Sequence, residues 1–456
     1  MKSILFLVLF LVQFCHAQTS IGHTTFTFND PTRTGGVGSG GGPGRQIQTE
    51  VYYPATTAGT STPVASGEFP IIVFGHGFAM NWDAYSNIWE HYIPRGYIMA
   101  FVRTESSLFP SPSHGDFGLD LTLVAQKMLD LQTTDPLFQN HIYPKVSLMG
   151  HSMGGGAAFL AANNNTNIDA LIGLAPAETN PSAIAVAPNV QVPSIVFSGS
   201  SDGVTPPAQH HIPMYDGITS TCKSFVNIIG GAHCYFANTN FNCDFGESTS
   251  STGISISRTE QQNATYSILD PWLDYQLKDI CTAYEAFQLY LTSTPGTTTQ
   301  TTCPNVPTVD ITQNGNLLQT SAQGSTYQWF LDGQLIPGAF ADFYELGPNA
   351  GGVYTVQVSF AFGCATSPNL NILGINNILF NQISIYPNPC KDFLLITNKG
   401  NQPIQATFLT VLGQKTKTVE LKNSSNTIPV SDLSPGIYWI LFEHSTGSFL
   451  QKCIIE

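Results

Sequence analysis

A serine between glycines follows a short apolar run at residues 146–149. Residues 150–154 read Gly-His-Ser-Met-Gly, the G-x-S-x-G pattern in which a serine occupies a tight turn between a strand and a helix. Glycine suits the flanking positions because a side chain there would crowd the turn. Such a turn exposes the hydroxyl of Ser152 and directs the amide of Met153 toward whatever the serine attacks. The pattern predicts a nucleophile; the alternative is a turn that only packs a helix on a strand.

Two further candidates each follow an apolar run. Asp202 lies in a turn after residues 194–199, and His233 follows residues 224–229 and two glycines. Alone, Asp202 reads as a turn former and His233 as one of 11 histidines, buried under its loop. With Ser152 they occur in the order Ser, Asp, His that α/β-hydrolases use. In those roles His233 is the general base, Asp202 fixes its tautomer, and the serine is acylated.

An oxyanion formed at this serine needs two N–H donors. The amide of Met153 is one. The second is expected in the loop after the strand predicted at residues 69–74, where residues 75–78 read Gly-His-Gly-Phe. Phe78 N–H is the predicted donor, and His76 is expected to be structural.

Alternating strand-like and helix-like segments position these residues. Strands are predicted at residues 24–28, 46–53, 69–74, 97–102, 146–149, 170–174, 194–199 and 224–229, and helices at 82–93, 116–131 and 155–162. This alternation predicts an α/β fold, a mostly parallel sheet with helices on both faces. Ligands bind such sheets at the carboxyl ends of the strands, where each candidate lies. The glycine-rich residues 34–44 lack the Lys-Ser/Thr of a phosphate-binding loop and are predicted to be a flexible loop.

Residues 46–290 resemble α/β-hydrolases of the dienelactone hydrolase, cutinase-like and chlorophyllase-like group, which includes bacterial polyester hydrolases. The likeness lies in Gln-Thr-Glu-Val-Tyr-Tyr-Pro at 48–54, in Gly-His-Ser-Met-Gly-Gly-Gly at 150–156, and in the order Ser, Asp, His. It implies an α/β-hydrolase catalytic domain at residues 18–292 that needs no metal or organic cofactor.

The resemblance also bears on substrate contacts. It implies Phe78 and Met153 as the oxyanion donors. Polyester hydrolases of this group usually carry a tryptophan after the next strand, where it stacks on an aromatic substrate; this chain has Ala177 there. Aromatic contacts are instead expected from Phe78, Trp82 and Tyr235, and the alternative for each ring is a partly exposed place in the core.

Beyond the hydrolase segment the pattern changes. Residues 293–302 are threonine-rich and are predicted to be a linker. Residues 303–372 alternate with a period of two, with an Asp332-Gly333 hairpin turn, and resemble a bacterial immunoglobulin-like sandwich. Residues 376–456 resemble the C-terminal sorting domain of the type IX secretion system, with Ser-Ile-Tyr-Pro-Asn-Pro at 384–389. Two small all-β sandwich domains are therefore expected after the hydrolase domain.

Residues 1–17 begin with Met-Lys-Ser, continue with an apolar run and end at an alanine, which predicts a secretory signal peptide. With the sorting domain, this predicts a secreted or cell-surface protein, exported through the periplasm of a Gram-negative bacterium by the type IX machinery. The net charge is −14 and only 10% of residues are charged, which argues against nucleic acid as a partner. A monomer is expected.

Eight cysteines remain after the signal peptide, and an even number in an exported chain suggests disulfides. The predicted pairs are Cys303–Cys364, Cys390–Cys453, Cys234–Cys243 and Cys222–Cys281, with the last two chosen from three possible pairings. The alternative, a metal site, lacks C-x-x-C spacing.

These features together predict a secreted serine carboxylic-ester hydrolase, lipase- or cutinase-like, acting on small or polymeric esters including polyesters. One alternative is a chlorophyllase- or acetylesterase-type hydrolase of small natural esters. Another, from a different class, is a catalytically inactive surface adhesin, against which the complete Ser-Asp-His set argues.

Overall fold

A computed structural model describes residues 20–347, 350–372, 383–399, 403–422, 424–444 and 447–456. Two compact units divide the chain at Val306 and Pro307. The predicted signal peptide lies outside the described residues. In the described part of the chain, no helix is long and apolar enough to cross a membrane.

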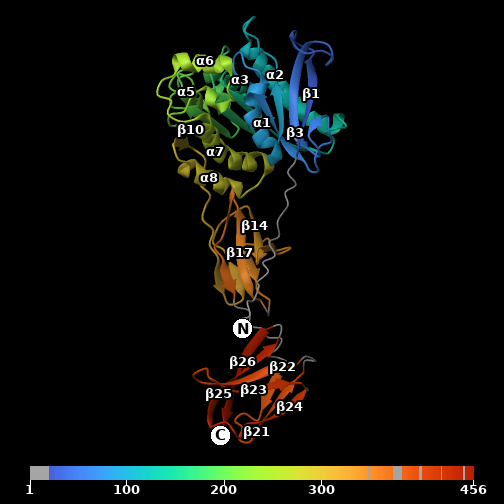
Figure 1. Ribbon diagram of the computed structural model, residues 1–456, viewed down its shortest axis with the longest axis vertical. Helices are drawn as coiled ribbons and strands as arrows, with labels where there is room; N and C mark the ends of the chain where they lie inside the picture. The colour runs from blue at the N-terminus through green and yellow to red at the C-terminus, as the bar shows by residue number, and fades with distance from the viewer. Residues whose placement is uncertain (1–19, 348–349, 373–382, 400–402, 423, 445–446) are drawn as a thin grey trace, which may run out of the picture. The chain divides into compact units, whose positions relative to one another are not determined.

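The first unit is built on an eleven-stranded mixed sheet with the order β11-β10-β9-β8-β7-β5-β6-β3-β1-β4 and β2 beside β3 (Figure 1). Strands β5 to β10 are parallel to one another, whereas β3 pairs antiparallel with β1 and β6, and β11 pairs antiparallel with β10. The strands are β1 Ser20–Asp30, β2 Gly36–Val37, β3 Arg45–Ala55, β4 Gly59–Thr60, β5 Phe69–Gly75, β6 Ile98–Val102, β7 Ile142–His151, β8 Ala170–Leu174, β9 Ser194–Gly199, β10 Lys223–Ile228 and β11 Thr297–Thr301. This sheet with its flanking helices confirms the predicted α/β-hydrolase fold.

Helices cover both faces of this sheet. They are α1 Ser86–Tyr92, α2 His114–Thr134, α3 Met153–Ala162, α4 Ala183–Val186, α5 His211–Gly217, α6 Phe241–Ser250, α7 Arg258–Lys278 and α8 Ala283–Ser293, with 3-10 turns η1 Trp82–Tyr85, η2 Ile93–Arg95, η3 Ala187–Asn189 and η4 Cys234–Phe236. Alternate residues of β7 face opposite layers, as the period of a strand requires. Val146 and Leu148 join a core with residues of α2 and α3, while Met149 faces α7.

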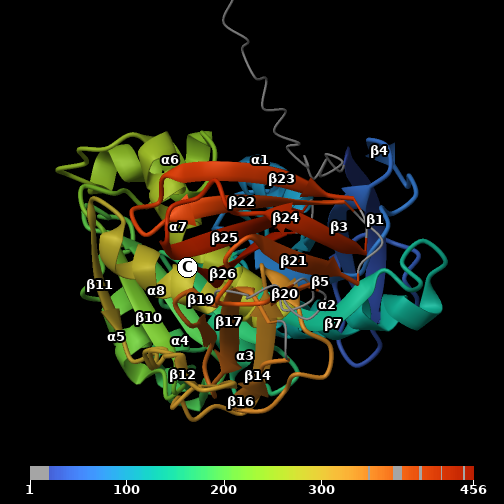
Figure 2. The ribbon, with the colours of Figure 1, turned by 90° about the horizontal axis from the view of Figure 1, so that it is seen from below.

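The second unit is all β over its described residues, as predicted. Its strands are β12 Thr312–Asn314, β13 Leu317–Gln319, β14 Thr326–Leu331, β15 Gln334–Leu335, β16 Phe343–Glu345, β17 Gly352–Ser359, β18 Cys364–Thr366, β19 Leu370–Ile372, β20 Ile383–Tyr386, β21 Phe393–Asn398, β22 Ile404–Thr410, β23 Lys415–Leu421, β24 Ser425–Pro429, β25 Gly436–His444 and β26 Gly447–Ile455. Asp332 and Gly333 have φ of 50° and 75° between β14 and β15, which confirms the predicted hairpin turn. Figure 2 shows β23, β22, β25 and β26 side by side in one sheet.

The threonine-rich segment predicted to be a linker differs from that prediction. Thr297–Thr301 forms β11, an edge strand that pairs antiparallel with β10. Threonine is β-branched and suits an exposed edge strand as well as it suits a linker. The segment therefore completes the sheet of the first unit.

Two predicted disulfides are wrong because Cys222 bonds to Cys303, with an Sγ–Sγ distance of 2.05 Å. This bond excludes both Cys222–Cys281 and Cys303–Cys364. It follows from β11, whose pairing with β10 brings the ends of the two strands together. The predicted Cys234–Cys243 bond is confirmed.

The predicted Cys390–Cys453 disulfide is also not formed. Both cysteines are free and buried, with their Sγ atoms 3.8 Å apart. Burial raises the pKa of the Cys453 thiol to about 12, which keeps it protonated at neutral pH. The two thiols face each other because Cys390 and Cys453 share a core with the surrounding strands of the sorting-domain segment.

Candidate active site

The turn between β7 and α3 holds Ser152 in a strained backbone conformation. Its φ and ψ are 56° and −122°, in a region that residues other than glycine rarely adopt. A Cβ atom on Gly150 would stand 2.2 Å from the carbonyl oxygen of Gly154, and one on Gly154 would stand 2.1 Å from that of Gly75. The glycines are thus required by contact with backbone of the turn and of β5, which a strand-turn-helix pattern alone does not reveal.

Asp202 and His233 follow two further strands of the parallel set, β9 and β10, and they are joined directly. His233 Nδ1 lies 2.7 Å from Asp202 Oδ2, and both side chains are buried. Burial raises the pKa of Asp202, but the neighbouring His233 and its hydrogen bond lower it further, so the net pKa lies below its usual value. This carboxylate is therefore ionised at neutral pH and able to fix the imidazole tautomer.

His151, the residue before Ser152, lies beside His233. The ring of His151 is 4.8 Å from the ring of His233, centroid to centroid, and His151 Nε2 lies 3.0 Å from the His233 carbonyl oxygen. In the part of the chain that the structure describes, no hydrogen bond joins Ser152 Oγ to His233, and the ring's hydrogen bonds, to Thr205 and Asp202, both involve Nδ1. The Nε2 atom is left for the serine proton. In unliganded hydrolases this bond is often long and tightens only with substrate.

A second buried histidine, His211, is linked to Asp202 through the hydroxyl of Thr205. Thr205 Oγ1 lies 2.9 Å from Asp202 Oδ2, 2.8 Å from His233 Nδ1 and 3.0 Å from His211 Nε2. Ser198 Oγ lies 2.8 Å from His211 Nδ1. Burial lowers the pKa of His211 to about 3, so its ring is neutral.

The direction of these hydrogen bonds follows from the protons available. A threonine hydroxyl has one proton, which the carboxylate of Asp202 accepts. The neutral ring of His211 then donates from Nε2 to Thr205 and accepts from Ser198 at Nδ1. Every donor in this series of hydrogen bonds, from Ser198 through His211 to Thr205, therefore points toward the carboxylate of Asp202. Sequence reasoning missed Thr205 and His211, although a threonine three residues after an aspartate is a recognisable turn signal.

The two predicted oxyanion donors both have unused N–H groups. Met153 is the first residue of α3, where N–H groups have no partner within the helix. In the loop after β5, Gly77 N–H donates to the Tyr85 hydroxyl at 2.8 Å, whereas Phe78 N–H has no hydrogen-bond partner among the described residues. The same Tyr85 hydroxyl lies 2.9 Å from His151 Nδ1. Tyr85 thereby connects the predicted oxyanion loop to the residue before Ser152.

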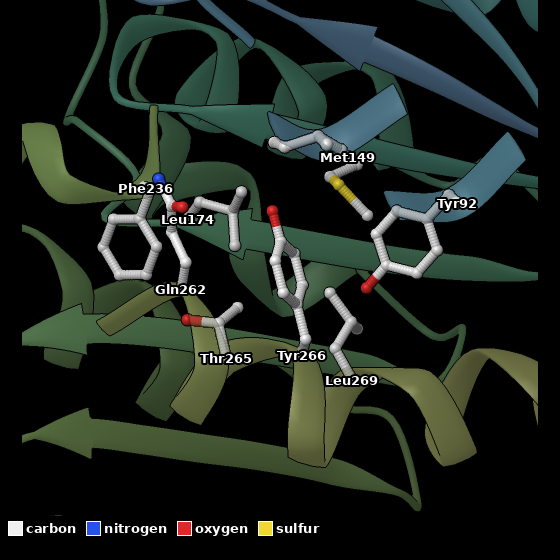
Figure 3. A pocket seen from close by; sticks show the side chains of 9 residues that line it. Tyr92, Met149, Leu174, Phe236, Gln262, Thr265, Tyr266 and Leu269 are labelled. Atoms are coloured by element: carbon white, nitrogen blue, oxygen red, sulfur yellow. The ribbon is translucent and has the colours of Figure 1, made fainter. Parts of the chain in front are cut away.

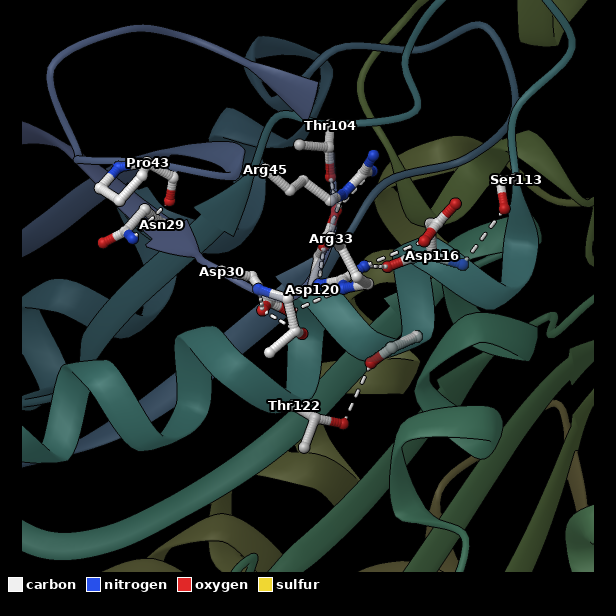
Figure 4. A network of polar contacts seen from close by, with 12 residues as sticks. Asn29, Asp30, Arg33, Pro43, Arg45, Thr104, Ser113, Asp116, Asp120 and Thr122 are labelled. Atoms are coloured by element: carbon white, nitrogen blue, oxygen red, sulfur yellow. Dashed lines mark hydrogen bonds and ion pairs between the residues drawn. The ribbon is translucent and has the colours of Figure 1, made fainter. Parts of the chain in front are cut away.

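His76, which was expected to be structural, is fully buried. Its Nε2 lies 2.8 Å from the carbonyl oxygen of Thr104, whose hydroxyl donates to Asp120 at 2.6 Å. Figure 4 shows Asp120 of α2 between Arg33 and Arg45. A guanidinium nitrogen of Arg33 lies 2.6 Å, and one of Arg45 2.8 Å, from the carboxylate oxygens of Asp120. Asp120 is completely buried, and this ion-pair network anchors the end of β6 beside the oxyanion loop.

The four residues predicted to contact substrate differ in their exposure and in their neighbours. Phe78 is 47% exposed. Trp82 is half-buried under Arg103, whose guanidinium lies 4.0 Å from its ring, and Tyr235 lies under Arg258 at 4.6 Å. Ala177 N–H donates to the Ser152 carbonyl oxygen at 2.8 Å. Phe78 is therefore the most exposed of the three rings.

Figure 3 shows a gap between α7 and the ends of β7 and β8. It is lined by nine residues, among them Met149, Leu174 and Tyr266, and none of them is a predicted site residue. It is a space in the packing beneath the sheet. Among the described residues, no group of three or more His, Cys, Asp and Glu side chains is arranged to hold a metal ion.

Two segments of the chain match known protein families. Residues 17–255, just over half of the chain, match the family described as PET hydrolase-like. The chain belongs to the PET hydrolase-like family. Residues 384–456 match the family described as secretion system C-terminal sorting domain.

The curated relatives of this PET hydrolase-like chain are distant. A bis(hydroxyethyl) terephthalate hydrolase of Streptomyces coelicolor is 27% identical over 239 residues, 52% of this chain and 64% of that protein. Cutinase est1 of Thermobifida alba is 24% identical over 206 residues, 44% of this chain and 60% of that protein. Chlorophyllase-1 of Citrus sinensis is 27% identical over 129 residues, 28% of this chain and 39% of that protein. The matches thus span less than two thirds of each relative.

Proposed function

We propose that this chain is a secreted serine carboxylic-ester hydrolase that forms an acyl-enzyme at Ser152. The observation that carries the proposal is the buried His233–Asp202 pair, at 2.7 Å, whose imidazole contacts His151, the residue before a serine held at positive φ between a strand and a helix. A strained serine next to an oriented imidazole is costly to maintain without a use. The family match and the relatives named as hydrolases and cutinases support the same reaction.

The proposed reaction uses each of these groups. His233 Nε2 takes the proton of Ser152 as its oxygen attacks the ester carbonyl, and Asp202 stabilises the imidazolium that forms. The N–H groups of Phe78 and Met153 bind the oxyanion. The C–O bond breaks as the imidazolium gives its proton to the leaving alcohol. Water, deprotonated by the same imidazole, then attacks the acyl-enzyme and releases the acid.

The substrate is proposed to be a small or polymeric ester. Relatives named as cutinases and as a terephthalate-ester hydrolase favour polymeric or aromatic esters, and those named as chlorophyllases favour a small natural ester. Ala177 offers no aromatic platform beside the serine. Cleavage of polyesters is therefore proposed to depend on rings elsewhere on the rim.

The C-terminal domain is proposed to serve export. The match of residues 384–456 to sorting domains supports secretion, with the type IX machinery as partner. For the hydrolase segment we propose residues 18–292 extended through β11, followed by an immunoglobulin-like domain that ends near residue 372.

The test is hydrolysis of p-nitrophenyl esters of rising chain length, and of a polyester film, by the purified chain. Ser152→Ala is expected to lose at least about 1,000-fold in kcat while keeping the native circular dichroism spectrum. Ser267→Ala, an exposed serine of α7, is the matched control and is expected to be fully active. Retention of activity in Ser152→Ala, or no ester hydrolysis by the unaltered chain, would exclude the proposal.

A further inference from the structure

A buried tyrosine lies between the predicted oxyanion loop, residues 75–78, and the turn of Ser152. Tyr85 is the last residue of η1 and is completely buried. Its hydroxyl oxygen lies 2.8 Å from the nitrogen of Gly77, the residue before Phe78. The same oxygen lies 2.9 Å from Nδ1 of His151, the residue before Ser152. One hydroxyl therefore joins the backbone beside one predicted oxyanion donor to the side chain beside the nucleophile.

The direction of each hydrogen bond follows from the groups available. A carbonyl oxygen only accepts, so His151 Nε2, 3.0 Å from the carbonyl oxygen of His233, carries the ring proton. Burial holds the pKa of His151 well below its usual value, so the ring is neutral and Nδ1 is an acceptor. Burial also raises the pKa of the Tyr85 hydroxyl, which keeps its proton and donates it to Nδ1. The thioether sulfur of Met80, 3.3 Å from that hydroxyl, is a weaker acceptor.

The peptide group between Gly77 and Phe78 is held from the other side. Met80 N–H donates to the Gly77 carbonyl oxygen at 3.2 Å, and His76 Nδ1 lies 2.9 Å from that oxygen. In a trans peptide the C=O and N–H groups point in opposite directions, so Phe78 N–H points away from both of these residues. Because Tyr85 also holds Gly77 N–H, two consecutive peptide groups of the loop have fixed orientations.

The loop backbone lies directly against the side chains that hold it. A Cβ atom on Gly77 would stand 2.8 Å from Met80 Sδ and 3.2 Å from both His151 Nδ1 and the Tyr85 hydroxyl. Protein interiors are packed closely enough to transmit small displacements. A change at the hydroxyl of Tyr85 is therefore expected to move Gly77, and with it the amide of Phe78.

We propose that Tyr85 is a positioning residue for ester hydrolysis, whose hydroxyl holds the Phe78 amide and Ser152 at the separation that the tetrahedral intermediate needs. It acts through Gly77 and His151, and it touches no substrate because it is completely buried. The inference rests on the proposed ester-hydrolase function and concerns how the same site stabilises the oxyanion. Oxyanion donors lower the barrier only when they are held in place before the reaction, and a misplacement of about 1 Å can cost roughly 100-fold in rate.

The experiment replaces Tyr85 by phenylalanine, which keeps the ring and removes only the hydroxyl. With p-nitrophenyl acetate, kcat is expected to fall at least about tenfold, less than the roughly 100- to 1,000-fold that follows outright removal of an oxyanion donor. KM is expected to stay within about twofold, because the substrate in its ground state does not depend on the oxyanion donors. The pH at which kcat/KM reaches half its maximum is expected to stay the same, because the substitution changes no charge.

A trifluoromethyl ketone inhibitor reports on the oxyanion donors directly. Ser152 Oγ adds to its carbonyl carbon, the carbonyl oxygen becomes the oxyanion, and the hydroxyl proton moves to His233. The inhibition constant in Tyr85→Phe is expected to rise by the factor by which kcat/KM falls, since inhibitor and transition state use the same two N–H groups.

Two further variants separate positioning from stability. Tyr53 is also completely buried, and its hydroxyl donates to the Thr62 carbonyl oxygen at 2.8 Å. Tyr53→Phe is the matched control, expected to lower the melting temperature but to leave kcat and the inhibition constant unchanged. His151→Phe removes the other half of the link and keeps a ring. The double variant Tyr85→Phe/His151→Phe is expected to lose no more activity than the more damaging single variant, because both substitutions break one connection.

The proposal is overturned by a folded Tyr85→Phe whose kcat and inhibition constant stay within about threefold of the unaltered chain. A loss confined to KM, an equal loss in Tyr53→Phe, or losses that multiply in the double variant would also overturn it. If Tyr85→Phe does not fold, His151→Phe decides, and unchanged kcat in that variant sinks the proposal. Failure of the proposed function looks different, because the unaltered chain would then neither hydrolyse the ester nor bind the trifluoromethyl ketone.

Discussion

Replacing Thr205 by valine tests the buried hydrogen-bond chain behind the catalytic pair. Valine has nearly the same shape and keeps the Thr205 backbone N–H, which donates to Asp202 Oδ1 at 2.7 Å. It removes only the hydroxyl, and with it the 2.9 Å bond to Asp202 Oδ2 and the partner of His211 Nε2. The hydrogen bond between His233 and Asp202 remains, but the carboxylate of Asp202 no longer accepts a hydrogen bond from residue 205's side chain.

The size of the effect follows from the bond removed. A hydrogen bond to a charged carboxylate contributes about 1.5–3 kcal/mol. If this stabilisation is lost from the transition state, kcat falls by about 10- to 150-fold, because about 1.36 kcal/mol of activation free energy corresponds to a tenfold change in rate. The buried Nε2–H of His211 is left unpaired, which lowers the free energy of unfolding by about 1–3 kcal/mol. KM is expected to stay within about twofold, because Thr205 lies behind the carboxylate and does not meet substrate.

The assay is kcat and KM for a soluble p-nitrophenyl ester between pH 6 and 9, with urea denaturation alongside. Thr205→Ser keeps the hydroxyl and is the matched control, expected to recover most of the activity. A folded Thr205→Val with kcat within about threefold of the unaltered chain would refute the idea that this hydroxyl orients Asp202. A loss confined to KM would refute it equally.

Three further predictions concern stability. Asp120→Ala leaves Arg33 and Arg45 without their buried partner and is expected to lower the free energy of unfolding by about 3–5 kcal/mol in urea titrations, and a loss below about 1 kcal/mol would contradict this. Replacing both Cys234 and Cys243 by alanine removes a disulfide that joins cysteines nine residues apart. The free energy of unfolding is expected to fall by about 2–3 kcal/mol in the same urea titration. An unchanged midpoint would show that α6 is held by its other contacts alone. Burial lowers the pKa of His211 from 6.5 to about 3, so below pH 6.5 the unfolded chain binds a proton that the folded chain does not. The free energy of unfolding is therefore expected to fall as the pH drops from 6.5 toward 3, by up to about 1.4 kcal/mol per pH unit. A melting temperature that is unchanged between pH 7 and pH 5 would argue against this.

Buried strands were the most predictable part of the fold. Strands β8 and β9 coincide with their predicted ranges because both are continuous apolar runs bounded by turns. Helix α7 was not predicted, since its 21 residues include Pro271 and many polar side chains, and its position depends on packing against the sheet. Helix α6 was missed for a related reason: its exposed rings do not follow an amphipathic pattern.

The site was predictable as residues but not as contacts. Ser152, Asp202 and His233 each follow a strand, and parallel strands bring such positions to one edge, which local patterns reveal. The support from Thr205, His211 and Tyr85 depends on side chains that meet only after folding. The disulfide of Cys222 depends on the pairing of β11 with β10, which a threonine-rich composition does not disclose.

The most direct test of the central claim is labelling of the purified chain with a fluorophosphonate, followed by peptide mapping by mass spectrometry. One adduct on Ser152 is predicted, absent from Ser152→Ala and formed much more slowly in His233→Ala, because the imidazole is needed to deprotonate the hydroxyl. No adduct on the folded chain, or an adduct on another residue, would contradict the account.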